Sequence, residues 1–189
     1  MLMIAPYDPS MLGTLEKVKK IGYDYVELAG FGNSNPADIA AALRKLGMRA
    51  VSCHSSIDPL LDADKAPAAI RDCKELGYLY YVLPWMDGAR LTDAASIEKV
   101  ISDFTAAGEL LRKNGIRFGY HNHDFEFKVM PNGQFALDEL YAGTTPAQLQ
   151  VEPDTCWIKV AGQDPAAYVR KYSGRVPVVH LKDYYLEGS

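Results

Sequence analysis

Histidine side chains stand at the ends of several predicted strands, close to carboxylates. Residues 121–127 (HNHDFEF) contain two histidines and two acids, and they directly follow the apolar segment 116–120. His54 ends the segment 48–53, and His180 ends the segment 176–179 in the same way. All four histidines of the chain therefore end predicted strands.

Acidic residues, a tryptophan and a lysine follow the same pattern. In a barrel of parallel strands the carboxyl ends converge on one face, so residues far apart in the sequence would line one cleft. A single polar residue at a strand end could equally mark the point where the strand leaves the core. It is much less expected that every member of the set has only this structural role. The set is Glu27, His54, Trp85, His121 with His123, Glu152 with Asp154, and His180 with Lys182 and Asp183.

The residue types in this set favour a metal site. Imidazole and carboxylate groups together bind divalent ions of intermediate hardness, such as Mn²⁺, Co²⁺, Mg²⁺ or Zn²⁺. Sulfur ligation is less expected, because Cys53, Cys73 and Cys156 are far apart in the sequence. A Ser/His/Asp hydrolase is weaker still, since the chain has no Gly-x-Ser-x-Gly segment.

Large aromatic residues accompany these segments. Trp85 and Trp157 are candidates to stack on a sugar ring of the substrate, and packing above the barrel is the structural alternative. For Phe127 we prefer packing over contact with a ligand.

Amphipathic segments that end in glycine alternate with short apolar segments along the chain. Glycine just past a helix end takes the left-handed conformation that caps it, as expected at Gly22, Gly47, Gly77 and Gly115. The predicted strands are 2–6, 23–28, 48–54, 78–84, 116–121, 149–153 and 176–180, and the predicted helices are 13–21, 36–46, 65–76, 93–113, 135–141 and 164–172. This alternation predicts an α/β fold with a parallel sheet. Because residues 6–10 contain no glycine, a phosphate-binding loop is not supported, and a (β/α) barrel is preferred.

The composition is that of a globular protein, and we expect residues 1–189 to form one domain. A net charge of −4 and a pI near 5.6 argue against nucleic acid and favour a small neutral or anionic metabolite. No apolar run approaches the roughly 20 residues that span a bilayer. The odd number of cysteines argues against a disulfide framework. We therefore expect a cytoplasmic protein without a membrane partner.

With these motifs the sequence resembles the xylose isomerase-like TIM-barrel superfamily, the sugar phosphate isomerase/epimerase group. The resemblance extends from Gly13 to Asp183. Each motif alone is weak, but together they are specific for the superfamily. They are the segments 13–18, 25–30, 83–85, 119–127, 154–157, 161–165 and 180–183.

The resemblance implies a divalent metal held by Glu, Asp, His and Glu from the last four strands of the barrel. Asp154 and His180 match the Asp and His positions. The first Glu position aligns with His121, so the first ligand would be an imidazole, or Glu126 would reach back instead. We therefore expect His121, Asp154 and His180 to bind the metal.

The resemblance stops before the eighth strand. Nine residues follow His180, too few for a crossover helix and a further strand, so the fourth family ligand is absent. We expect an incomplete barrel of about seven strands, either because the chain is truncated or because a partner chain completes it. Exposed sheet edges recruit partners, which predicts a homodimer.

The expected function is that of a metal-dependent isomerase or epimerase acting on a small sugar or sugar derivative. The proton would move beside a metal-polarised carbonyl, with His123 and Glu126 as candidates to carry it and Lys182 to stabilise oxyanion charge. Glu27 and His54 are expected on the active face as substrate contacts. One alternative is a lyase or dehydratase acting on a keto-sugar or inositol derivative, and another is an inactive barrel fragment or binding subunit.

Overall fold

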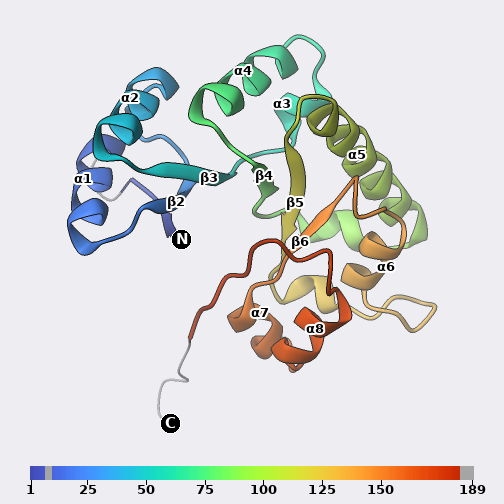
Figure 1. The fold of residues 1–189 in the computed structure, drawn as a ribbon. Helices are drawn as coiled ribbons and strands as arrows, with labels where there is room; N and C mark the ends of the chain where they lie inside the picture. The colour runs from blue at the N-terminus through green and yellow to red at the C-terminus, as the bar shows by residue number, and fades with distance from the viewer. Residues whose placement is uncertain (7–9, 184–189) are drawn as a thin grey trace. The chain divides into compact units, whose positions relative to one another are not determined.

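In the part of the chain that the structure describes, six parallel strands form an open sheet whose order, β1-β2-β3-β4-β5-β6, follows the chain (Figure 1). A computed structural model describes residues 1–6 and 10–183, so part of the glycine-free segment 6–10 lies outside the described residues. Helices alternate with the strands, and the architecture is an incomplete TIM barrel, as predicted. The chain divides into two compact units, residues 1–82 with 110–117, and residues 83–109 with the chain from 118 onward.

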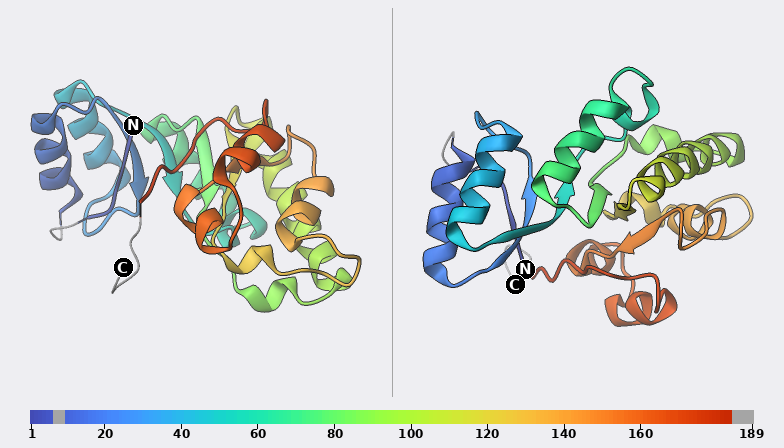
Figure 2. Two further views of the ribbon diagram at one scale, coloured as in Figure 1. Left: turned by 90° about the horizontal axis from the view of Figure 1, so that it is seen from below. Right: turned by 45° about the horizontal axis from the view of Figure 1, so that its top comes forward.

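The first unit is a succession of β/α pairs. Helices α1, α2 and α4 lie side by side in chain order along the strands (Figure 2). The elements are β1 (Leu2–Ile4), α1 (Met11–Ile21), β2 (Tyr25–Ala29), α2 (Pro36–Leu46), β3 (Arg49–His54), α3 (Asp58–Leu61), α4 (Ala66–Leu76) and β4 (Tyr80–Leu83).

The second unit contains most of the last two strands and their helices, while the end of α5 and the first residue of β5 fall in the first unit. Within the described part of the chain, no helix is both long and apolar enough to cross a membrane. The elements are η1 (Gly88–Leu91), α5 (Ala94–Lys113), β5 (Arg117–His121), η2 (Phe125–Phe127), α6 (Ala136–Ala142), β6 (Gln150–Glu152), α7 (Thr155–Val160) and α8 (Pro165–Lys171).

Local sequence sets the bounds of α2, which are those predicted. The Asn35 side chain accepts a hydrogen bond from the Asp38 amide at 2.9 Å, and Pro36 occupies the first helical position. At the other end Gly47 has a φ of 63°, and the Met48 amide donates to the Leu43 carbonyl. This left-handed cap ends the helix and starts the chain into β3.

Aromatic packing fixes the position of β5 in the second unit. The Phe104 ring of α5 lies 5.5 Å from the Phe118 ring and 5.4 Å from the Tyr120 ring, measured between centroids. All three side chains are buried, and so is His121 at the end of the strand. Close packing of these rings restricts movement of β5. The position of His121 at the end of the strand is therefore well defined.

The seventh predicted strand, 176–180, is wrong. This segment does lie beside β6, because the Val151 amide donates to the Arg175 carbonyl and the His180 amide donates to the Pro153 carbonyl. In a parallel ladder the next bond would run from the amide of residue 177 to Val151, but Pro177 has no amide hydrogen. The described residues therefore keep only an isolated parallel bridge, between Asp154 and His180.

Among the described residues, two short α-helices and the 3₁₀ helices η1 and η2 were not predicted. Helix α3 has four residues and α7 has six, too few for a clear amphipathic period. Helix α7 begins directly after Asp154, whose side chain accepts hydrogen bonds from the Cys156 and Trp157 amides. A residue predicted as a metal ligand is thus also a helix cap.

Close packing of α5 against the segment before β6 generates the first prediction. A Cβ atom at Gly108 would lie 2.0 Å from the Gln148 carbonyl oxygen, so Gly108→Ala forces backbone apart. We expect a loss of about 2–3 kcal/mol in the free energy of unfolding, measured by urea denaturation. Gly13→Ala is the matched control, because a Cβ there has no atom within 4 Å. Equal stability of the two variants would contradict this packing.

Candidate functional site

Three segments of the second unit bring polar side chains together. Strands β5 and β6 pair in parallel, with His121 opposite Glu152 (Figure 1). The segment that follows α8 reaches β6 at the bridge between Asp154 and His180. The ends of β5, β6 and this segment therefore stand next to one another.

His121, Glu152 and His180 form a compact cluster. One ligand atom from each lies within 4.8 Å of the others. His180 Nε2 is 2.8 Å from Glu152 Oε1, and the two imidazole rings have their centroids 4.6 Å apart. All three side chains are buried, with between 1% and 7% of their surface exposed. These three residues are called the His/Glu cluster below.

The His/Glu cluster fits a divalent ion. Two imidazole nitrogens and one carboxylate oxygen form a donor set that suits Zn²⁺ and similar ions, and a three-ligand site leaves a position for water or substrate.

Glu152 is the member of the cluster that the sequence placed at a strand end but did not predict as a metal ligand. Asp154 was the predicted ligand at this point, and that assignment stays a prediction. Its Oδ1 accepts the two amide hydrogen bonds that cap α7, and its Oδ2 lies 2.6 Å from Lys182 Nζ. The same Oδ2 is 3.5 Å from His121 Nε2 and 4.0 Å from His180 Nδ1. Asp154 and Lys182 are thus neighbours of the cluster, joined to each other as a salt bridge.

Glu126 is completely buried behind the end of β5. Its two carboxylate oxygens accept hydrogen bonds from the Tyr120 hydroxyl and from the His123 amide, the latter at 2.8 Å. Burial raises the pKa of Glu126 to about 7, although the hydrogen bond from Tyr120 acts in the opposite direction. The short 3₁₀ helix η2 places Glu126 so that it folds back on the segment holding His123.

His123 lies within a row of aromatic rings. Its ring centroid is 5.2 Å from that of His121, 5.1 Å from that of Trp157 and 6.0 Å from that of Phe125, which it stacks upon. Trp85 extends the row, 6.4 Å from Phe125, and 56% of its surface is exposed. The aromatic row therefore runs from an exposed tryptophan to the His/Glu cluster.

Glu27 and His54 belong to the first unit. A register shift between Val26 and Glu27 sets Glu27 opposite Ser52 and Ala29 opposite His54. Glu27 Oε2 lies 3.5 Å from His54 Nε2, and the Glu27 side chain is fully buried. The structure thus pairs these two predicted substrate contacts with each other on neighbouring strands.

Known proteins share this architecture. Residues 15–189 match the family described as the xylose isomerase-like TIM barrel. The chain belongs to this family. No curated protein matches its sequence.

Solved structures agree with the family assignment. A sugar phosphate isomerase/epimerase from Parabacteroides distasonis is 24% identical with a TM-score of 0.82, and the match covers 99% of this chain and 79% of that chain. A second one from the same organism is 25% identical with a TM-score of 0.80, covering 98% and 80%. An L-ribulose 3-epimerase is 14% identical with a TM-score of 0.69, covering 96% and 69%. The chain thus spans between 69% and 80% of the length of these neighbours.

Burial of Glu126 generates a prediction about pH. Its pKa of about 7 in the folded protein exceeds the ordinary value of 4.5, so the folded state binds the proton more tightly than the unfolded state. Stability from this group is present below pH 4.5 and is lost as the pH rises to about 7, by about 3 kcal/mol. Glu126→Gln mimics the protonated side chain, and the Tyr120 hydroxyl can reverse to accept from its amide.

We therefore expect Glu126→Gln to match wild type near pH 4.5 and to exceed it in stability near pH 8, in urea denaturation at a series of pH values. For Glu16→Gln, at an exposed carboxylate of α1, the difference in stability from wild type should stay constant across the pH series. A constant difference between Glu126→Gln and wild type across the whole pH series would show that folding does not raise the pKa of Glu126.

Proposed function

We propose that this protein is a metal-dependent isomerase or epimerase-like enzyme that acts on a small sugar or sugar derivative. The observation that carries the proposal is the His/Glu cluster at the ends of β5 and β6, in a chain of this family. Its two imidazoles and its carboxylate would hold a divalent ion such as Mn²⁺, Co²⁺, Mg²⁺ or Zn²⁺. Bound there, the ion would polarise a substrate carbonyl and so acidify the neighbouring C–H bond.

His123 is the residue we assign to proton transfer. Its ring is only partly buried and lies beside His121, so it can reach a substrate held at the cluster. Glu126 was the other candidate, but both of its oxygens are occupied by Tyr120 and by the His123 amide. We therefore assign Glu126 to holding the His123 segment in position, and His123 to carrying the proton.

Lys182 and the aromatic row complete the proposed site. The Lys182 ammonium group, 39% exposed and paired with Asp154, would stabilise negative charge that develops on the substrate oxygen. Trp157 and Trp85, with Phe125 and His123 between them, offer ring faces on which the apolar side of a sugar can stack. Glu27 and His54 stay predicted substrate contacts.

Metal binding tests the assignment of the ligands. Glu152→Gln removes the carboxylate charge of the cluster while keeping its shape, so we expect the affinity for Mn²⁺, measured by isothermal titration calorimetry, to fall by roughly 100-fold. Asp154→Asn is the matched comparison, because an asparagine oxygen can still cap α7. It should change the affinity by less than about fivefold. If Asp154→Asn instead loses the metal and Glu152→Gln keeps it, the ligand assignment is wrong.

Proton exchange tests the reaction. Wild-type protein with Mn²⁺ in D₂O should introduce deuterium beside the carbonyl of its substrate, in a panel of ketopentoses and ketohexoses with and without phosphate. His123→Gln should bind Mn²⁺ as wild type does but exchange at least about 100-fold more slowly, since general acid–base catalysis contributes 10²–10⁴-fold.

Other outcomes of the same experiment separate the alternatives. Loss of water from the substrate would indicate a dehydratase. An absence of any exchange by metal-loaded wild type would indicate a binding subunit. Full exchange by His123→Gln would overturn the role given to this residue.

A further inference from the structure

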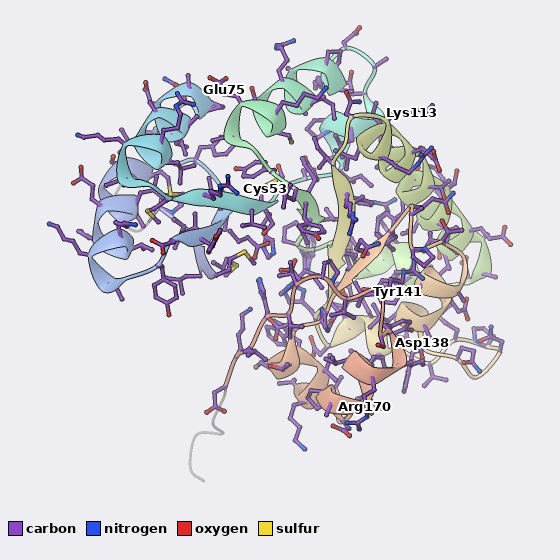
Figure 3. All side chains as sticks on the ribbon, viewed as in Figure 1. Cys53, Glu75, Lys113, Asp138, Tyr141 and Arg170 are labelled. Atoms are coloured by element: carbon purple, nitrogen blue, oxygen red, sulfur yellow. The ribbon has the colours of Figure 1, made fainter. Side chains whose placement is uncertain are left out.

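Two cysteines of the first unit meet between β3 and α4. Cys53 lies on β3 (Figure 3) and Cys73 on α4, and only 4% and 2% of their surfaces are exposed. Both are free, and their thiols hydrogen-bond to each other. Buried cysteines usually serve as small hydrophobic residues. This pair differs because the two thiols hydrogen-bond to each other and because both residues line the same pocket.

A pocket of about 400 Å³ gives access to the two thiols. Both cysteines line it, as do Ser55, Pro59 and Tyr78. The Tyr78 hydroxyl is buried and has no hydrogen-bond partner among the described residues. It therefore offers a polar contact inside a mostly apolar pocket. A molecule little larger than water fits such a space easily.

The two thiols are not equivalent. Burial raises the pKa of Cys53 well above its ordinary value. The hydrogen bond with Cys53 lowers the pKa of Cys73, against the effect of burial. Since the thiolate is the nucleophile, Cys73 is the sulfur expected to react first, and Cys53 stands next to it as the second thiol.

We propose that Cys73 and Cys53 form a peroxide-oxidisable dithiol, in which Cys73 reacts first and Cys53 completes a disulfide between α4 and β3. The Cys73 sulfur attacks one peroxide oxygen, the O–O bond breaks, and the departing oxygen leaves as water. The resulting sulfenic acid is then attacked by the Cys53 sulfur, the S–O bond breaks, and a second water leaves with the last thiol proton. Two thiols are oxidised, and one hydrogen peroxide is reduced to two waters.

The inference is independent of the reaction proposed for the His/Glu cluster. Its residues all belong to the first unit, and they need neither metal nor sugar. Cys156, the third cysteine, lies two residues after Asp154 in the second unit, and burial raises the pKa of its thiol. It provides an internal comparison for reactivity.

The test uses the reduced 189-residue chain carrying Cys156→Ser, treated with equimolar hydrogen peroxide. We expect intact-mass analysis to show the loss of two hydrogens, and peptide mapping to find Cys53 linked to Cys73, with both changes reversed by a phosphine reductant. In the additional variant Cys53→Ser, dimedone should trap a sulfenic acid on Cys73. In Cys73→Ser, Cys53 should stay reduced. Circular dichroism confirms that each variant is folded.

Three results would overturn the proposal. One is that both thiols remain alkylatable at a peroxide concentration that oxidises Cys156 in wild type. Another is a disulfide that forms only between chains, at a rate that rises with protein concentration. The third is sulfenic acid on Cys53 and not on Cys73. If either serine variant fails to fold, the mapping of the Cys156→Ser protein decides alone.

Discussion

A single buried guanidinium group holds the second unit together. Arg175 is 9% exposed, and it donates hydrogen bonds to the Leu149 carbonyl at 2.8 Å, the Tyr141 carbonyl at 2.6 Å and the Thr144 hydroxyl at 2.6 Å. Tyr141 belongs to α6 (Figure 3), and Leu149 directly precedes β6. Hydrogen bonds from a charged donor contribute about 1.5–3 kcal/mol each, so one side chain ties the end of α6 to the start of β6. Burial lowers the pKa of Arg175, yet an arginine remains charged at neutral pH.

The backbone of the same residue sets the position of the site. The Arg175 carbonyl accepts from the Val151 amide, which starts the next segment alongside β6. Pro177 interrupts the ladder, and pairing resumes where the His180 amide donates to the Pro153 carbonyl and the Thr155 amide donates to the His180 carbonyl. Because the segment 175–180 pairs with the chain at β6 both before and after Pro177, its alignment along β6 is fixed. His180 therefore projects toward Glu152 even though no regular strand carries it.

Features set by local sequence could be predicted, and features set by tertiary contacts could not. Helix α2 has the predicted bounds because Asn35 and Gly47 cap it through their immediate neighbours. The prediction of a strand at 176–180 was wrong because it gave more weight to the apolar, β-branched residues than to Pro177. The missing amide hydrogen of Pro177 matters only when β6 lies beside the segment. The gathering of His121 and His180 followed from the barrel pattern. The complete burial of Glu126 did not, since it depends on the fold of η2 and on the Tyr120 hydroxyl.

The segment Glu152-Pro153-Asp154 shows how two nearby carboxylates come to differ. Buried charges are costly unless they are paired and hydrogen-bonded. Asp154 meets this condition through the α7 amides and Lys182, so recruiting it to an ion would expose the helix end and break a salt bridge. Glu152 lies within the strand, in register with His121 and against His180, and an ion could take its charge without disturbing any helix cap. For this reason Glu152, and not Asp154, is the carboxylate we assign to the ion.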